Sequence, residues 1–217
     1  GICGASIGTV ETNITNNNIS SSSITNEAQN DGCGNTGGII AFIYPFNSSI
    51  EAYNYKIDNC NVTNTDLTTY SGNVGGLIGT TFSGSRAKVS NCKVTGSRND
   101  ANEYINKITS YSKSGSNAVS SIGIANAEER IQIENITVKD MSIRHEIQDK
   151  SSGTNTAGIL GYSASEATIK DCKTIDCDLY SEGHYSGLTG VSAIAATISN
   201  RTGNPTIIEN CEVRGTN

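Results

Sequence analysis

Short apolar runs alternate with polar residues along the whole chain, and two of these runs recur in a fixed order. The first is rich in glycine and small residues and reads VGGLIG at residues 74–79. Related segments begin at residues 1, 37, 120, 157 and 192. The second reads VSNCKV at residues 89–94, and it recurs as ITNNNI, IDNCNV, IENITV, IKDCKT and IENCEV from residues 14, 57, 133, 169 and 208. A Gly-Asn or Gly-x-Asn spacer separates most units. Six such units, each a few tens of residues long, cover the chain, and a repeat of that length is typical of a solenoid.

The alternation within each unit predicts β-strands with a bend. Residues Ile133 and Ile136 can face the same side only if the strand bends at Asn135, because a strand of period two cannot skip a residue. Asparagine tolerates the left-handed backbone that such a bend needs. We therefore predict an all-β fold, a parallel β-helix of about six coils that form one domain, 1–217. The coils are expected near residues 1–35, 36–73, 74–117, 118–155, 156–190 and 191–217. An antiparallel sandwich of short strands is the alternative, although it does not predict bends in phase.

The residue at the bend is expected to form a structural ladder. It is Asn16, Asn59, Asn91, Asn135, Asp171 and Asn210 in the six units. Asparagine amides can bond to the coil above and the coil below. We therefore expect these side chains to stack inward, at a turn between two parallel sheets.

A column of cysteines follows directly after the bend, at Cys60, Cys92, Cys172 and Cys211. In-register neighbours in a parallel sheet lie about 4.8 Å apart, which is within the Cα range of a disulfide. Free cysteine also packs as a small hydrophobic residue. The sequence therefore predicts either a column of buried thiols or bridges within Cys60/Cys92 or Cys172/Cys211. We expect no metal, because no set of cysteines and histidines converges at short spacing.

Two segments depart from the repeat. In residues 98–115, Asp100 and Glu103 have capping-box spacing, and Tyr104, Ile105 and Ile108 could share one face, so we expect a short helix or a loop. The other segment holds five of the twelve aromatic residues in residues 42–55. Among them, Tyr44, Phe46, Tyr53 and Tyr55 are candidate contacts for a sugar or a partner protein, since tyrosine presents a flat amphipathic face. Packing of these rings onto the solenoid is the alternative.

Composition excludes several functions. The net charge of −6 and the lack of a basic cluster argue against nucleic acid as a partner. No apolar run approaches the roughly 18 residues of a membrane span. The two histidines, His145 and His184, lack a nucleophile motif nearby and are expected at the surface. Glu128, Glu129 and Glu134, with Arg130, form a mixed patch, which is usually a solvated face. We expect no cofactor and no enzymatic activity.

The two recurring motifs, GGLIG and [IV]-x-[ND]-C-x-[VT], resemble the GLUG-type repeat of bacterial surface and secreted proteins, which is associated with right-handed parallel β-helices. Units two, three and five match it best. The resemblance implies an extracellular or cell-surface structural module, a scaffold or adhesin, and it provides no catalytic residues. The alternative is a carbohydrate-active β-helix enzyme or a carbohydrate-binding domain, with glycans as ligands. A groove with several carboxylates and a basic residue would favour that alternative, and a smooth Ser/Thr/Asn surface would favour the scaffold.

The two ends of the repeat array are expected to be covered. Unit one starts directly in a glycine-rich segment, and unit six ends in the spacer at residues 215–217. Placed in series, the spacer and the first segment read like residues 152–161. Open solenoid ends expose strand edges and core. We therefore expect either further coils of a longer chain or head-to-tail self-association, which builds a filament.

Overall fold

The computed structural model describes residues 1–8, 11–28, 34–45, 53–82, 85–111, 117–125, 131–146, 154–182, 190–199 and 205–217. Within these ranges the regular structure consists of β-strands, and the strands of every sheet pair in parallel. The prediction of an all-β, parallel fold is therefore confirmed. None of the described residues belongs to a helix that could span a bilayer.

Four sheets, named A to D in the order in which the chain visits them, enclose the core. Sheet A contains β1 (Cys3–Gly8), β5 (Thr36–Gly37), β6 (Ile40–Pro45), β10 (Val74–Thr81), β14 (Asn117–Ala125), β18 (Thr154–Ala157), β19 (Leu160–Ser163), β23 (Gly190–Ser192) and β24 (Ala195–Ile198). Sheet B contains β2 (Thr12–Thr15), β7 (Tyr53–Asp58), β11 (Ser85–Ser90), β15 (Ile131–Glu134), β20 (Ala167–Lys170) and β25 (Ile207–Glu209). Sheet C contains β3 (Asn18–Ser20), β8 (Asn61–Thr63), β12 (Lys93–Thr95), β16 (Thr137–Lys139), β21 (Lys173–Ile175) and β26 (Glu212–Arg214). Sheet D contains β4 (Ser23–Asn26), β9 (Asp66–Thr69), β13 (Lys107–Ser110), β17 (Ser142–His145) and β22 (Asp178–Ser181).

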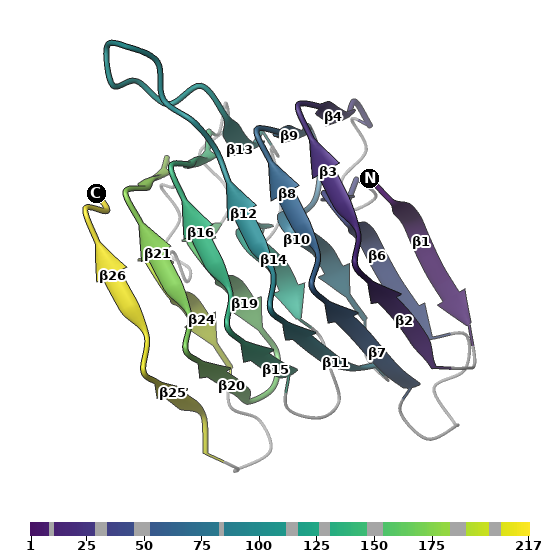
Figure 1. Ribbon diagram of the computed structural model, residues 1–217. Helices are drawn as coiled ribbons and strands as arrows, with labels where there is room; N and C mark the ends of the chain where they lie inside the picture. The colour runs from purple at the N-terminus through teal and green to yellow at the C-terminus, as the bar shows by residue number, and fades with distance from the viewer. Residues whose placement is uncertain are drawn as a thin grey trace.

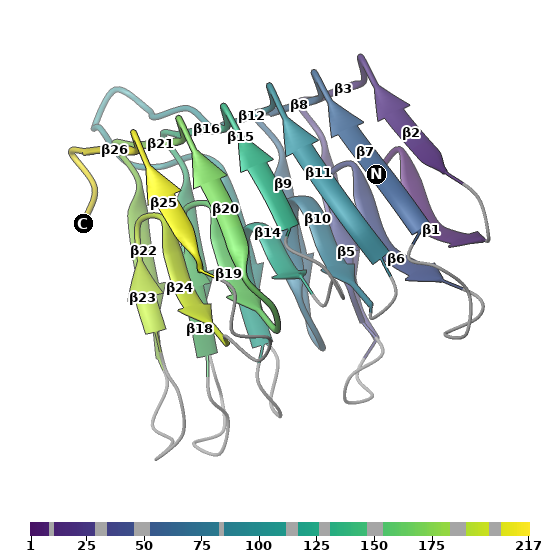
Figure 2. The ribbon, with the colours of Figure 1, turned by 90° about the horizontal axis from the view of Figure 1, so that it is seen from below.

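One pass through the sheets makes one coil, and the strands group into coils 1 to 6: β1–β4, β5–β9, β10–β13, β14–β17, β18–β22 and β23–β26. In Figure 1 the strands of sheet C run up the near face while the coils advance from the N-terminus on the right to the C-terminus on the left. Figure 2, seen from below, shows the strands of sheet B side by side across the near face, with sheet A behind them. This winding is right-handed, which is the usual hand of a crossover between parallel strands.

Each coil turns from sheet B to sheet C at a single residue whose φ lies between 52° and 60°. These residues are the six that the sequence places at the bend: Asn16, Asn59, Asn91, Asn135, Asp171 and Asn210. The first corner is therefore where the alternation predicts it. A second corner follows five residues later and leads into sheet D. It has a positive φ at Ser21, Asn64, Asp140, Asp176 and Gly215.

The core is built from columns of apolar side chains, one from each sheet. In sheet C, Val62, Val94 and Val138 lie in register and are buried. Sheet A places a glycine opposite two of these valines. A Cβ on Gly76 would lie 2.8 Å from Cγ2 of Val94, and a Cβ on Gly38 would lie 2.8 Å from Cγ2 of Val62. Glycine recurs in the first motif because the valine of sheet C fills the space that a side chain would need.

The insertion after β12 is expected to be a short helix or a loop, and over its described residues the structure has the loop. Its ends meet in an isolated antiparallel bridge between Arg98 and Tyr104. Ile108 lies in β13 and fills the sheet D column between Leu67 and Ile143, so it cannot share a helical face with Tyr104. Tertiary packing of Ile108 therefore overrides the local capping signal.

Arg98 holds this loop across the neighbouring coils. Its guanidinium lies 4.2 Å from the centre of the Tyr104 ring. Its Nε donates to Oδ1 of Asp140 at 3.2 Å, and its Nη2 donates to the carbonyl oxygen of Asp176 at 2.7 Å. The loop of coil 3 thus lies against the second corners of coils 4 and 5.

Candidate functional site

The asparagine ladder of the first corner forms in part, with Asn91 Nδ2 donating to Asp58 of the neighbouring coil, and it faces solvent. Asn59 Nδ2 donates to Oδ1 of Asn16 at 2.7 Å, and Asn135 Nδ2 donates to Oδ1 of Asn91 at 2.9 Å. All four asparagine side chains are exposed. The prediction that the ladder points inward is wrong, because the residue two positions before the bend and the residue directly after it face the core, as Ile133 and Ile136 do around Asn135. The side chain at the bend is left on the outer side of the corner.

The backbone amides at the first corner nevertheless take part in the hydrogen bonding between coils. The amide of Asn59 donates to the carbonyl of Ser90, and the amide of Asn91 donates to that of Glu134, both at 3.1 Å. Each of these bends is therefore hydrogen-bonded to the backbone of the next coil. The ladder is a structural feature of the outer surface, where its amides also meet solvent.

The cysteine column lies inside this corner. Cys60, Cys92 and Cys172 are buried and Cys211 is partly buried, and all four are free thiols in the structure. The thiols of Cys92 and Cys172 donate to the carbonyls two residues earlier, at 3.0 and 3.2 Å. Burial raises the pKa of each of these two thiols to about 12. Of the two sequence-based alternatives, the structure therefore has buried thiols, and they are too weakly acidic to act as nucleophiles at neutral pH.

Charged side chains gather in a groove on the outer face of sheet B, beside the ladder. The groove encloses about 760 Å³ and is lined by Lys56, Asp58, Lys88, Ser90, Asn91, Glu134, Asn135, Lys170 and Asp171. Lys88 Nζ lies 3.1 Å from Oε2 of Glu134, and Lys170 Nζ lies 2.7 Å from Oε1 of Glu209. Of the predicted mixed patch, Glu134 thus lies in this groove, whereas residues 128–130 lie outside the described residues.

One carboxylate of the groove, Asp58, is held by hydrogen bonds from its neighbours. Hydrogen bonds from Ser90 and then Asn91 lower the pKa of Asp58, at 2.7 and 2.8 Å. Asp58 is therefore ionised at neutral pH and cannot donate a proton as a general acid. The described residues hold no group of His, Cys, Asp or Glu side chains that could bind a metal ion.

The aromatic residues of coil 2 do not form one contact surface. Tyr55 in β7 is only 3% exposed and lies in the core, so its assignment as a contact residue is wrong. Tyr44 in β6 is 45% exposed, with its ring edge-on to Phe82 at 5.2 Å between centroids. Phe46 lies outside the described residues, and only the backbone of Tyr53 is described. Period-two alternation in β7 turns Tyr55 inward.

His145 is buried, which contradicts its predicted place at the surface. It ends β17, in register with Ser110 and Ser181, and its side chain is fully inaccessible. Neither Nδ1 nor Nε2 has a hydrogen-bond partner among the described residues. Burial lowers the pKa of His145 to about 4. It is therefore a neutral core residue and not a catalytic base, while His184 lies outside the described residues.

A second asparagine ladder lies where sheet D passes into sheet A, and the sequence analysis missed it. Asn73 Nδ2 donates to Oδ1 of Asn35 at 3.0 Å and to Oγ1 of Thr80 at 2.9 Å. Asn73 Oδ1 in turn accepts from the amide of Ala118 at 2.9 Å. The recurring Gly-x-Asn spacer is the signal that could have revealed it, since it repeats once per coil.

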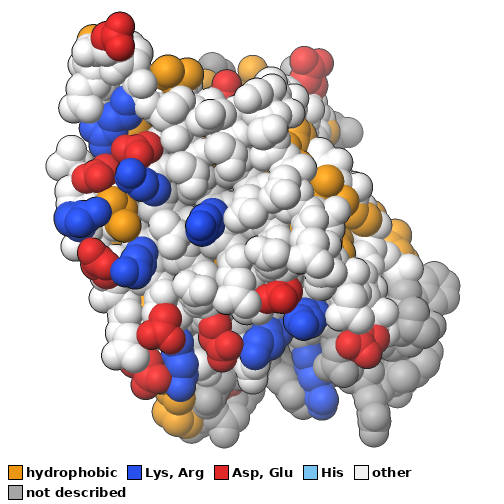
Figure 3. Space-filling view, in the orientation of Figure 1, with side chains coloured by type: hydrophobic (Ala, Val, Ile, Leu, Met, Phe, Trp, Pro, Cys, Tyr) orange, Lys and Arg blue, Asp and Glu red, His pale blue; other side chains and the backbone are white. Residues whose placement is uncertain are grey.

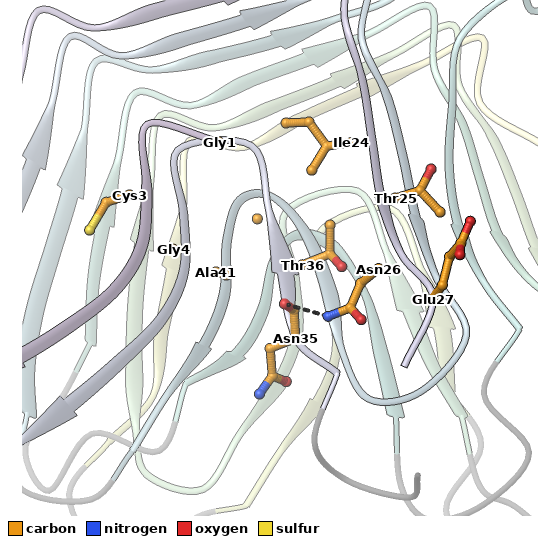
Figure 4. A pocket seen from close by; sticks show the side chains of 11 residues that line it. Gly1, Cys3, Gly4, Ile24, Thr25, Asn26, Glu27, Asn35, Thr36 and Ala41 are labelled. Carbon is orange, nitrogen blue, oxygen red and sulfur yellow. Dashed lines mark hydrogen bonds between the residues drawn. The ribbon is translucent and has the colours of Figure 1, made fainter. Parts of the chain in front are cut away.

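The first coil is open at its outer end. A hollow of about 290 Å³ lies between coil 1 and the start of coil 2, lined in part by Cys3, Ile24, Asn26 and Asn35. Figure 4 shows these side chains around the opening, where Asn26 Nδ2 donates to the carbonyl of Asn35 at 3.4 Å. At the other end of the solenoid, Val213 in β26 is exposed.

The charge of the outer face over sheet C changes along the solenoid. Over coils 1 and 2 it carries the neutral side chains of β3 and β8, with Asn61 Nδ2 donating to Oδ1 of Asn18 at 2.8 Å. Figure 3 shows this uncharged expanse, with acidic and basic side chains gathered toward the C-terminal coils and along the lower edge. The surface thus has both features that the sequence analysis uses to distinguish scaffold from carbohydrate binding.

Fold and surface together define a right-handed parallel β-solenoid with a ladder-lined outer corner. No protein-family model, curated protein or solved structure matches this chain. The resemblance to the GLUG-type repeat therefore stays a prediction.

Proposed function

We propose that this chain is an extracellular or cell-surface structural module, a β-solenoid scaffold or adhesin that is extended end to end. One observation supports this most: the core columns continue to both end coils without a cap among the described residues. Ile14 and Ile19 in coil 1 are partly exposed, whereas Ile57 and Val62 at the same positions in coil 2 are buried. Such an end is stabilised when another coil covers it.

The two ends are complementary in register. If coil 1 of one copy followed coil 6 of another, Ile208 would lie beside Ile14, and Val213 would lie beside Ile19. The corner residues Asn210 and Asn16 would continue the outer ladder. This pairing opposes no like charges in sheets B and C, where Glu209 and Glu212 would face the neutral side chains of coil 1. The same fit would serve a further coil of a longer chain.

A catalytic role has less support than a structural one. The ionised Asp58, the buried thiols and the buried His145 each lack a property that an acid, a nucleophile or a base needs. The extracellular location rests on the repeat resemblance alone. Nucleic acid is not among the proposed partners.

A tandem fusion tests the proposal. Two copies joined directly, so that Asn217 precedes Gly1, should form one continuous solenoid that melts in a single transition above the melting temperature of one copy. Ile19→Lys in the second copy should abolish that gain, because it places a charge in the buried junction. Thr15→Lys, on the outer face of the same coil, is the matched control and should retain the gain.

The isolated chain tests the self-association form of the proposal. Sedimentation velocity should show concentration-dependent head-to-tail oligomers, and Ile19→Lys should reduce them. A fusion that melts like two independent copies, together with a monodisperse monomer at high concentration, would overturn the scaffold proposal.

A further inference from the structure

The groove on sheet B is a periodic array of hydrogen-bonding groups. The side chains that line it come from coils 2 to 5: the last outward position of each sheet B strand, an earlier outward position in coils 2 and 3, and the corner residue in coils 3 to 5. Neighbouring coils are spaced by about 4.8 Å, so four coils span about 14 Å. One coil step is close to the length of one pyranose unit in an extended glycan.

The groups of the groove are held in place before any ligand arrives. Asp58 Oδ1 accepts from Ser90 and Asn91, and Asn91 Oδ1 accepts from Asn135. Lys88 is oriented by its ion pair with Glu134. Side chains that are already ordered lose little conformational entropy on binding, so a ligand gains more from each contact.

The charge pattern selects the class of ligand. The lining contains three lysines, at 56, 88 and 170, and three carboxylates, at 58, 134 and 171. A polyanion would meet the carboxylates, and a polycation would meet the ammonium groups. The groove lies on the face of a sheet whose backbone is already paired, so a peptide could not add as a strand. Neutral hydroxyl groups both donate and accept, and they match alternating ammonium, carboxylate and amide groups.

We propose that this groove binds a neutral oligosaccharide of about three to four sugar units, lying along the solenoid axis across coils 2 to 5. The lining contains no aromatic side chain, so each module binds weakly, and a stack of modules gains strength through multivalency. This proposal goes beyond the scaffold role and does not depend on end-to-end association.

The test is an NMR titration of the whole chain, kept dilute so that it is monomeric. The probes are cellotetraose, maltotetraose and mannotetraose, with tetragalacturonate and a chitosan tetramer as charged comparisons. At least one neutral probe should shift the side-chain amide signals of Asn91 and Asn135. Lys88→Ala should weaken that binding by about threefold to tenfold, because a ligand hydrogen bond is lost.

Lys93→Ala is the matched control, since Lys93 is an exposed lysine of the same coil on the other side of the corner. It should leave binding unchanged, and both variants should retain the melting temperature of the wild type. The proposal is overturned if no neutral probe shifts the two amides, if a charged probe binds more tightly than every neutral one, or if Lys93→Ala weakens binding as much as Lys88→Ala.

Discussion

Acid should destabilise this protein through His145 as the pH falls from about 6.5 to about 4. The folded pKa is about 4, against an ordinary value of 6.5, because the imidazole is buried without a described partner. Between these two pH values the unfolded chain binds a proton that the folded chain does not. The free energy of unfolding therefore rises with pH across this window and falls as the pH is lowered through it.

The size of the effect follows from the two pKa values. The difference between 6.5 and about 4, at about 1.4 kcal/mol per pH unit, corresponds to about 3 kcal/mol of stability. This stability is fully present above pH 6.5 and is lost by about pH 4. It is a large fraction of the roughly 5–15 kcal/mol of a typical domain.

Urea unfolding of the wild type and of His145→Ser, measured at intervals from about pH 7 to about pH 4, checks this prediction. Serine is the residue that the neighbouring coils carry at this position, at Ser110 and Ser181. The variant should be less stable than the wild type at neutral pH because it leaves a cavity, but it should lose most of the pH dependence in this window. Parallel curves for the two proteins would refute the reasoning, since the proton would then bind elsewhere.

Three further outcomes follow from the packing. Gly76→Val should cost about 1–3 kcal/mol in thermal melts because its Cβ would meet Val94 at 2.8 Å, whereas Gly4→Ala should cost little, since nothing lies within 4 Å of the added atom. Cys92, with a buried thiol whose pKa is about 12, should react with iodoacetamide only after denaturation, and rapid labelling of the native chain would contradict this. Asn91→Leu should lose about 1–2 kcal/mol because leucine disfavours a φ of 55°, and Asn91→Gly should lose less; equal losses would show that the amide ladder, and not the backbone, dominates.

The sequence by itself determines the coil. Each bend depends on a local property, the tolerance of Asn or Asp for a positive φ, and each strand depends on alternation, so both can be read from a few neighbouring residues. The period then places Ile57, Val89 and Ile133 in one column, and the structure has them buried in register. The small residues of the first motif can likewise be read from the sequence, because coils that stack closely leave no room for larger side chains at that position.

Which side of the molecule a residue faces was decided by the tertiary structure. The ladder residue Asn91 lies on the outer side of the corner because Val89 and Cys92, two positions before it and directly after it, fill the core. Ile108 joins sheet D although its local sequence favours a helix, because burial between Leu67 and Ile143 outweighs propensity. His145 is buried although histidine is usually exposed, because its neighbours in the stack leave it no path to solvent. The charged groove, too, is assembled from residues more than a hundred positions apart in the chain. Contacts of this kind depend on how one coil lies on the next, and no local pattern encodes them.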